Sequence, residues 1–151
     1  MLLIRPFHSK DEAAVIELWH QCGLIVPQND PKKDIERKLK INSELFLIGE
    51  LDNQIIASCM AGYEGHRGWI NYLAVAPHKQ RNGIATQMMD YVEKLLHEIG
   101  CPKINLQIRS TNLKVIEFYK SIGFVQDDVL SFGKRIHIDD RKVEQDAAAN
   151  P

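Results

Sequence analysis

The stretch LAVAPHKQRNGIA, which runs from Leu73 to Ala85, decides the fold of this chain. An apolar, strand-like run ends at Pro77, a short polar and basic loop follows, and a long amphipathic helical pattern begins at Gly83. A loop that turns into a helix N-terminus points several backbone N–H groups at one spot, where the helix dipole adds partial positive charge. Gly83 permits close approach of the backbone, and Lys79 and Arg81 add positive charge nearby. The stretch therefore predicts an anion site, and we expect its ligand to be a pyrophosphate.

The common nucleotide-binding motifs do not account for this loop. The chain has no G-x-x-x-x-G-K-[ST] and no G-x-G-x-x-G between a strand and a helix, so a P-loop or dinucleotide fold is poorly supported. Residues 80–85, QRNGIA, instead resemble the Q/R-x-x-G-x-G/A signature of the GNAT superfamily of acetyl-coenzyme A-dependent N-acyltransferases, with Ala85 where many members have Gly. The resemblance implies that the cofactor is bound by Gln80, Arg81, Asn82, Gly83, Ile84 and Ala85.

A second motif lies downstream, in NLKVIEFYKSIGF from Asn112 to Phe124. It is similar to the N-x-x-A-x-x-x-Y-x-x-x-G-F pattern of the same family, with Val115 at the usual Ala position. Transfer of an acyl group from a thioester to an amine needs a proton for the departing thiolate, and a phenol is a suitable donor. The resemblance implies that Tyr119 contacts the cofactor and acts as the general acid. An aromatic core residue is the alternative interpretation of Tyr119, and Asn112 either binds the cofactor or caps its helix.

The end of the strand before the loop supplies backbone groups. In the resembled family two parallel strands splay apart here and expose N–H and C=O groups to the pantetheine arm. The resemblance therefore adds Leu73, Ala74 and Val75 to the cofactor-binding residues. An unpaired N–H from this segment could hold the thioester oxygen.

The general base is the position where this sequence departs from the family pattern. Some members, including ribosomal-protein N-terminal acetyltransferases, carry a Glu in the strand before the Asn motif, where this chain has Gln107. An amide cannot take a proton, so our candidate base is Glu64, acting directly or through water, with His66 as runner-up. A solvated turn carboxylate beside a structural His is the alternative, and no base is needed if the amine arrives neutral.

Hydrophobic periodicity predicts the element order β-α-α-β-β-β-α-β-α-β. The expected strands cover residues 1–6, 45–51, 54–63, 69–76, 103–109 and 124–134, and the expected helices follow positions 9, 30, 83 and 112. The strand–helix–strand unit around Ala85 requires a parallel, right-handed crossover. We therefore expect an α/β fold, with a central mixed sheet of six to seven strands flanked by about four helices. The same order matches the GNAT fold, and the resemblance covers most of the chain.

Length and composition restrict the class of protein. At 151 residues the chain is one domain, which we assign to residues 1–138, and we expect the charged, Ala-rich residues 139–151 to form a disordered tail. The net charge of −1 gives no basic field for nucleic acid or an anionic membrane. No apolar run approaches a signal peptide or a membrane span, which predicts a cytoplasmic protein. Three widely spaced cysteines, Cys22, Cys59 and Cys101, are typical of reduced thiols and predict no metal site.

The expected function is transfer of an acetyl group from acetyl-CoA to a primary amine of a small molecule or peptide, by direct attack in a ternary complex. Loops such as residues 24–30 and 64–68 are expected to shape the acceptor pocket, and their acidic residues would suit a cationic amine. Two alternatives stay open: a catalytically idle acyl-CoA-binding sensor or scaffold, and a nucleotide-binding regulator. A homodimer is compatible with the sequence, which does not fix the oligomeric state.

Overall fold

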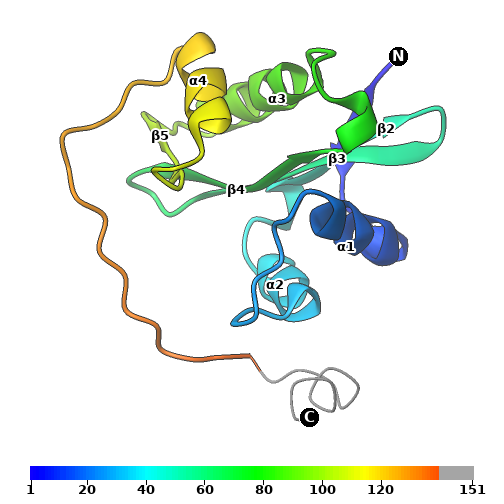
Figure 1. Cartoon of the computed structure of the whole chain (residues 1–151), viewed down its shortest axis with the longest axis horizontal. Coiled ribbons are helices and arrows are strands. Elements are labelled where there is room, and N and C mark those ends of the chain that lie inside the picture. The colour runs from blue at the N-terminus through cyan, green and yellow to red at the C-terminus, as the bar shows by residue number, and fades with distance from the viewer. Residues whose placement is uncertain (140–151) are drawn as a thin grey trace.

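The computed structural model describes residues 1–139 and contains one five-stranded sheet with helices on both faces (Figure 1). The strands are β1 (Leu3–Pro6), β2 (Phe46–Leu51), β3 (Gln54–Tyr63), β4 (Gly68–Val75) and β5 (Ile104–Asn105). The helices are α1 (Glu12–Gln21), α2 (Pro31–Lys38), α3 (Ile84–Glu98) and α4 (Leu113–Ser121), with short 3-10 turns η1 (Ser9–Asp11), η2 (Ser43–Leu45) and η3 (Pro77–Lys79). Helices α1 and α2 cover one face of the sheet, and α3 and α4 cover the other.

The sheet follows chain order, β1-β2-β3-β4-β5. Strands β1 to β4 are antiparallel, and β5 is parallel to β4 because α3 carries the chain back across the sheet. Asp52 and Asn53 join β2 to β3 with φ values of 50° and 62°, a conformation that these two residue types tolerate in tight hairpins. The mixed α/β fold and the parallel crossover are confirmed.

The predicted strand count of six to seven is wrong for the described residues, which form five strands. Strand β5 is reduced to two residues, and residues 124–134, expected to form closing strands, pair with no strand. Alternating apolar residues indicate an extended backbone, but a strand forms only where a neighbouring edge accepts its hydrogen bonds. We call residues 125–139, which leave the body of the domain after α4, the C-terminal arm (Figure 1).

The far end of the C-terminal arm is attached to α2. The Asp139 carboxylate accepts hydrogen bonds from Arg37 Nη1 at 3.0 Å, Arg37 Nη2 at 2.8 Å and the backbone N–H of Asp30 at 2.8 Å. The paired guanidinium holds the pKa of this carboxyl well below its usual range. Apart from Asp139, the tail predicted for residues 139–151 lies outside the described residues. No helix between residues 1 and 139 has the length and apolarity needed to cross a membrane.

The core contains a buried network of two linked hydrogen bonds that fixes the shape of β4. Trp19 Nε1 donates to Ser58 Oγ at 3.0 Å, and Ser58 Oγ donates to the Tyr72 carbonyl at 2.8 Å. The Trp19 ring also stacks on the Tyr72 ring, with centroids 3.8 Å apart. Tyr72 has φ of 52°, and the β3–β4 register shifts opposite it. These contacts therefore stabilise a bulge in the middle of β4.

Replacing Ser58 tests the importance of this bulge. Because Ser58 is fully buried and bridges two polar groups, Ser58→Ala leaves the Trp19 N–H without its acceptor. We expect the free energy of unfolding to fall by about 1–3 kcal/mol in chemical denaturation. Ser43→Ala, at an exposed serine of η2, serves as the control and should change stability by less than about 0.5 kcal/mol. Equal effects of the two substitutions would show that these two buried hydrogen bonds do not stabilise the fold.

Candidate active site

The connection between β4 and α3 forms a loop with free backbone donors. Arg81 and Gly83 have φ values of 65° and 75°, which turn the backbone sharply before the first helical residue, Ile84. Within the described chain, no acceptor takes a hydrogen bond from the N–H groups of residues 81 to 86. A Cβ on Gly83 would meet no atom within 4 Å, so the positive φ rather than crowding requires glycine there. We call residues 76–86 the candidate anion loop.

Side-chain amides brace the candidate anion loop from within. Gln80 Nε2 donates to the Val75 carbonyl at 3.0 Å. Asn82 Nδ2 donates to the Lys79 carbonyl at 3.1 Å and to the Gln80 carbonyl at 3.3 Å. The Arg81 side chain is exposed. Two of the predicted binding residues therefore position the backbone, and Arg81 adds positive charge at the surface.

Strands β4 and β5 form a fork. They pair only at Gly68 with Ile104 and at Trp69 with Asn105, so residues 70–75 of β4 have no strand on that side. On the other side β4 remains paired to β3 through Ala74 and Val75. The fork closes at Gly68 and opens toward the candidate anion loop. The predicted splay at the end of β4 is therefore present, and it leaves backbone groups available to a ligand.

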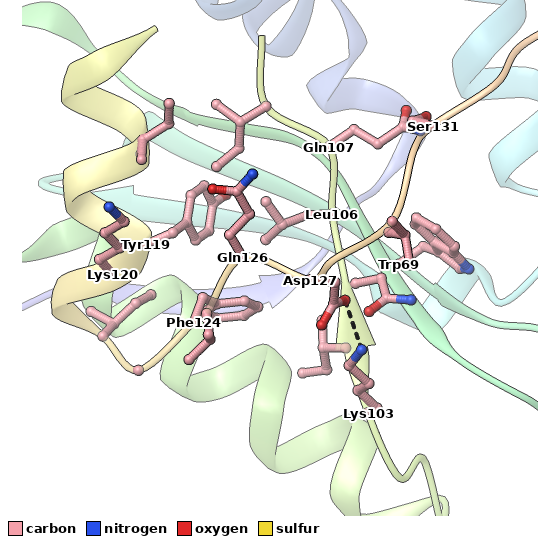
Figure 2. A pocket seen from close by; sticks show the side chains of 18 of the residues that line it. Trp69, Lys103, Leu106, Gln107, Tyr119, Lys120, Phe124, Gln126, Asp127 and Ser131 are labelled. Carbon is pink, nitrogen blue, oxygen red and sulfur yellow. Dashed lines mark hydrogen bonds and ion pairs between the residues drawn. The ribbon is translucent and has the colours of Figure 1, made fainter. Parts of the chain in front are cut away.

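Tyr119 projects from α4 toward the sheet (Figure 2). Its ring is 7% exposed and packs edge-on against Phe118 and Phe124, with centroids 5.1 Å and 5.3 Å away. No described residue forms a hydrogen bond with the Tyr119 hydroxyl. Every fully buried side-chain oxygen or nitrogen among the described residues does have a hydrogen-bond partner. The Tyr119 hydroxyl is therefore not fully buried and contacts solvent. Burial raises the pKa of Tyr119 above its ordinary value. Tyr119 thus combines a packed ring with an accessible, protonated hydroxyl.

Asn112 caps α4. Its Oδ1 accepts the Val115 N–H at 3.4 Å, and the side chain is exposed. The capping interpretation is therefore correct. The Nδ2 group has no partner among the described residues, so cofactor binding through that group remains compatible with the cap.

Glu64 lies in the turn between β3 and β4, at the closed end of the fork. Its carboxylate accepts hydrogen bonds from the backbone of Arg67, from the His66 N–H at 2.7 Å and from Trp69 Nε1 at 3.2 Å. These hydrogen bonds, the one from Arg67 first, hold the pKa of the exposed carboxyl below its usual range. The eight residues of β4, roughly 25 Å, separate Glu64 from the candidate anion loop. The structure does not bring Glu64 to that loop.

A phenol–carboxylate pair that sequence reasoning missed lies across the sheet from Tyr119. The Tyr72 hydroxyl donates to Asp34 Oδ2 at 2.6 Å, and Arg37 Nη2 donates to Asp34 Oδ1 at 2.7 Å. Burial, and then Asp34, raise the pKa of Tyr72. No local pattern reveals this pair, because Tyr72 reads as a strand aromatic and Asp34 as a solvated helix residue 38 positions away.

Together these features can bind an elongated ligand that carries an anion at one end. The candidate anion loop supplies backbone donors, the fork supplies a strand edge, and Tyr119 supplies a proton donor on the face of the sheet covered by α3 and α4. Within residues 1–139 no three His, Cys, Asp or Glu side chains gather in a way that could hold a metal ion.

Comparison with known proteins assigns the chain to a family. The model of the acetyltransferase (GNAT) family matches residues 12–124. A protein named as an acetyltransferase from Pectobacterium atrosepticum is 45% identical over 139 residues, covering 92% of this chain and 98% of the relative. Another from Sodalis glossinidius is 46% identical over 134 residues, covering 88% and 94%. The structure of a Clostridium acetobutylicum protein described as a predicted acetyltransferase with acetyl-CoA is 26% identical, with a TM-score of 0.66, covering 88% of this chain and 96% of that one. The chain therefore belongs to the acetyltransferase (GNAT) family.

Proposed function

We propose that this protein transfers the acetyl group of acetyl-CoA to a primary amine of a small molecule or peptide, by direct attack within a ternary complex. The observation that carries the proposal is the fork between β4 and β5, which opens at the candidate anion loop and leaves β4 backbone groups unpaired. Membership of the acetyltransferase family supports the reaction class. The Clostridium relative with acetyl-CoA supports the choice of acyl donor.

The fork and the candidate anion loop fit the chemistry of coenzyme A. A diphosphate is matched by backbone N–H groups at a helix N-terminus, and a pantetheine amide is matched by an open strand edge. The residues proposed to contact the cofactor are Leu73, Ala74, Val75, Gln80, Arg81, Asn82, Gly83, Ile84, Ala85, Asn112 and Tyr119. Free N–H groups on the β4 edge would also stabilise negative charge on the thioester oxygen during attack.

Tyr119 is the proposed general acid. Its hydroxyl has no competing protein acceptor among the described residues, and its raised pKa keeps it protonated at neutral pH. The neutral phenol can therefore donate its proton to the departing thiolate.

Tyr72 and Asp34 lie on the opposite face of the sheet, which α1 and α2 cover. We propose that the amine approaches from that face.

The route of the amine proton follows from the position of Glu64. Glu64 remains a proposed base acting through water, but its carboxylate already accepts three hydrogen bonds and its pKa is lowered. These contacts favour a reaction in which the amine arrives neutral.

The same contacts of Glu64 also favour the second candidate function, a catalytically idle acyl-CoA-binding module. Release of free thiol from acetyl-CoA over a panel of amines, corrected for hydrolysis, separates an enzyme from such a module.

The substitution Tyr119→Phe tests the general acid. We expect kcat to fall by about 100-fold or more, with the affinity for acetyl-CoA within about threefold of the parent, because the ring packing is retained and only the proton donor is lost. Thiol-release kinetics give kcat, and calorimetry gives the affinity. Tyr91→Phe, which removes a partly exposed phenol from α3, is the matched control and should be neutral. Unchanged turnover of Tyr119→Phe at every pH would remove Tyr119 from the mechanism.

The pH dependence of turnover provides a second test. Because burial raises the pKa of Tyr119 above its ordinary value of 10.0, the acid stays protonated throughout the neutral and mildly alkaline range. We therefore expect kcat to rise as the acceptor amine loses its proton and to show no Tyr119-dependent decline below pH 10. Steady-state rates across pH, with folding monitored by circular dichroism, measure this. A decline with an apparent pKa well below 10 that Tyr119→Phe abolishes would contradict the assignment.

A further inference from the structure

Arg37 on α2 links two carboxylates that are far apart in the sequence. Its Nη2 donates to Asp34 Oδ1 at 2.7 Å and to Asp139 Oδ2 at 2.8 Å, and its Nη1 donates to Asp139 Oδ1 at 3.0 Å. The pair between Arg37 and Asp139 is bidentate, an arrangement that fixes the orientation of a guanidinium as well as its position. The end of the C-terminal arm therefore determines how Arg37 meets Asp34.

Asp34 in turn fixes the hydroxyl of Tyr72. An ion-paired carboxylate only accepts hydrogen bonds, so the 2.6 Å contact between the Tyr72 hydroxyl and Asp34 Oδ2 uses the phenol proton. Arg37 and Asn29 Nδ2 donate to the same carboxylate, the latter at 3.2 Å and 3.4 Å, so three donors hold Asp34 in place. The Tyr72 ring is fixed as well, because it stacks on Trp19 with centroids 3.8 Å apart.

The Tyr72 oxygen keeps its capacity to accept a hydrogen bond. A phenol oxygen can donate one hydrogen bond and accept others, and within residues 1–139 no donor contacts this oxygen. The side chain is half-buried. Burial, and then Asp34, raise the pKa of Tyr72, so the phenol stays neutral. Tyr72 therefore presents a neutral oxygen with free lone pairs on the face of the sheet covered by α1 and α2.

Tyr72 lies at the open edge of the fork. Strand β4 has no neighbour on the β5 side over residues 70–75, and the bulge at Tyr72 lies within that stretch. The three residues of β4 proposed to contact the cofactor, Leu73, Ala74 and Val75, follow directly. A group bound to the Tyr72 oxygen would therefore lie close to the part of β4 proposed to hold the thioester.

Given the acetyl transfer proposed above, on which this inference rests, we propose that the Tyr72 oxygen accepts a hydrogen bond from the acceptor amine and that Asp139 positions Tyr72 for this contact. Asp139 acts through Arg37 and Asp34 and does not itself touch the amine. The end of the C-terminal arm is thereby a component of the acceptor side of the site.

The chemistry of this arrangement matches a primary amine. A neutral primary amine has two N–H donors and one lone pair on nitrogen. One N–H donated to the Tyr72 oxygen orients the nitrogen and leaves its lone pair free to attack the thioester carbon. A group that presents only lone pairs, such as a carboxylate, would be repelled by the Tyr72 oxygen, because the phenol O–H is already donated to Asp34. Tyr72 and Asp34 together therefore favour an acceptor that carries an N–H.

Steady-state kinetics of the full chain test the contact with the amine. The probe is the amine of the panel that gives the largest kcat/KM. We expect Tyr72→Phe to lower kcat/KM for that amine by about tenfold or more, because one hydrogen bond is lost while the ring can still stack on Trp19. The acetyl-CoA affinity from calorimetry should stay within about threefold of the parent. Tyr91→Phe is the matched control and should change kcat/KM by less than about twofold. An unchanged kcat/KM in Tyr72→Phe overturns the proposal.

A double-mutant cycle tests the role of the arm. Asp139→Asn should lower kcat/KM for the amine by about threefold or more, because Arg37 loses a bidentate charge pair and no longer fixes Asp34. In the Tyr72→Phe background the same substitution should change kcat/KM by less than about twofold, because Asp139 acts only through the Tyr72 hydroxyl. Asp128→Asn, at an exposed residue of the arm, is the control and should be neutral in both backgrounds. Effects of Asp139→Asn and Tyr72→Phe that simply multiply would contradict the positioning role.

NMR of the full chain gives a readout that does not depend on turnover. A carbon-13 label at tyrosine Cζ reports the hydrogen bonding of each of the four phenols, and the resonance lost in Tyr72→Phe identifies Tyr72. We expect Asp139→Asn to shift that resonance and Asp128→Asn to leave it in place. A Tyr72 resonance that Asp139→Asn does not move overturns the link between the arm and Tyr72. An inactive parent with a shifted resonance would instead remove the proposed function, and the amine contact with it, while confirming that link.

Discussion

The separation of β4 from β5 is the constraint on which the candidate site depends. The two strands share only two residue pairs, and β4 then continues to Val75 without a neighbour on that side. A strand edge inside a domain requires a partner for its backbone groups, and a bound ligand with amide groups can be that partner. The bulge at Tyr72, held by Ser58 and stacked on Trp19, bends β4 in the same region. The candidate anion loop follows directly at the end of β4, so the open edge and the free loop amides are adjacent along the chain.

The two faces of the sheet differ in chemistry at this point. Tyr119 reaches the sheet from the face covered by α3 and α4, and Tyr72 with Asp34 lies on the face covered by α1 and α2 (Figure 1). Arg37 connects the second group to the C-terminal arm, because it binds both Asp34 and Asp139. One guanidinium therefore couples the residues proposed to receive the amine to the far end of the C-terminal arm. The acidic groups near α2 are expected to attract an amine, and the free amides of the candidate anion loop are expected to attract a diphosphate. The two attractive groups therefore lie on different elements of the fold.

Local signals in the sequence predicted most of the fold. The strand, loop and helix around Gly83 were correctly predicted because the apolar run, the glycine and the helical period are encoded within neighbouring residues. The motif around Tyr119 likewise placed that residue on a helix beside the sheet. The features that were missed depend on distant partners. The Tyr72–Asp34 pair joins two elements through a bulge that has no sequence signature, and the shortness of β5 depends on which edge is available to it. The carboxylate of Glu64 makes it a candidate base in the sequence, but no sequence pattern reveals that two backbone N–H groups and the Trp69 indole already bind that carboxylate.

The central claim is that backbone amides between Arg81 and Ala85 bind the diphosphate of coenzyme A and direct its thioester toward Tyr119. Isothermal titration calorimetry that compares acetyl-CoA with S-acetylpantetheine, which has the same thioester and no diphosphate, tests this claim most directly. We predict clear heat of association for acetyl-CoA and an affinity for S-acetylpantetheine that is lower by about 100-fold or more, because several charge-assisted hydrogen bonds are lost. Equal affinities for the two thioesters, or no heat with acetyl-CoA at millimolar concentration, would contradict it.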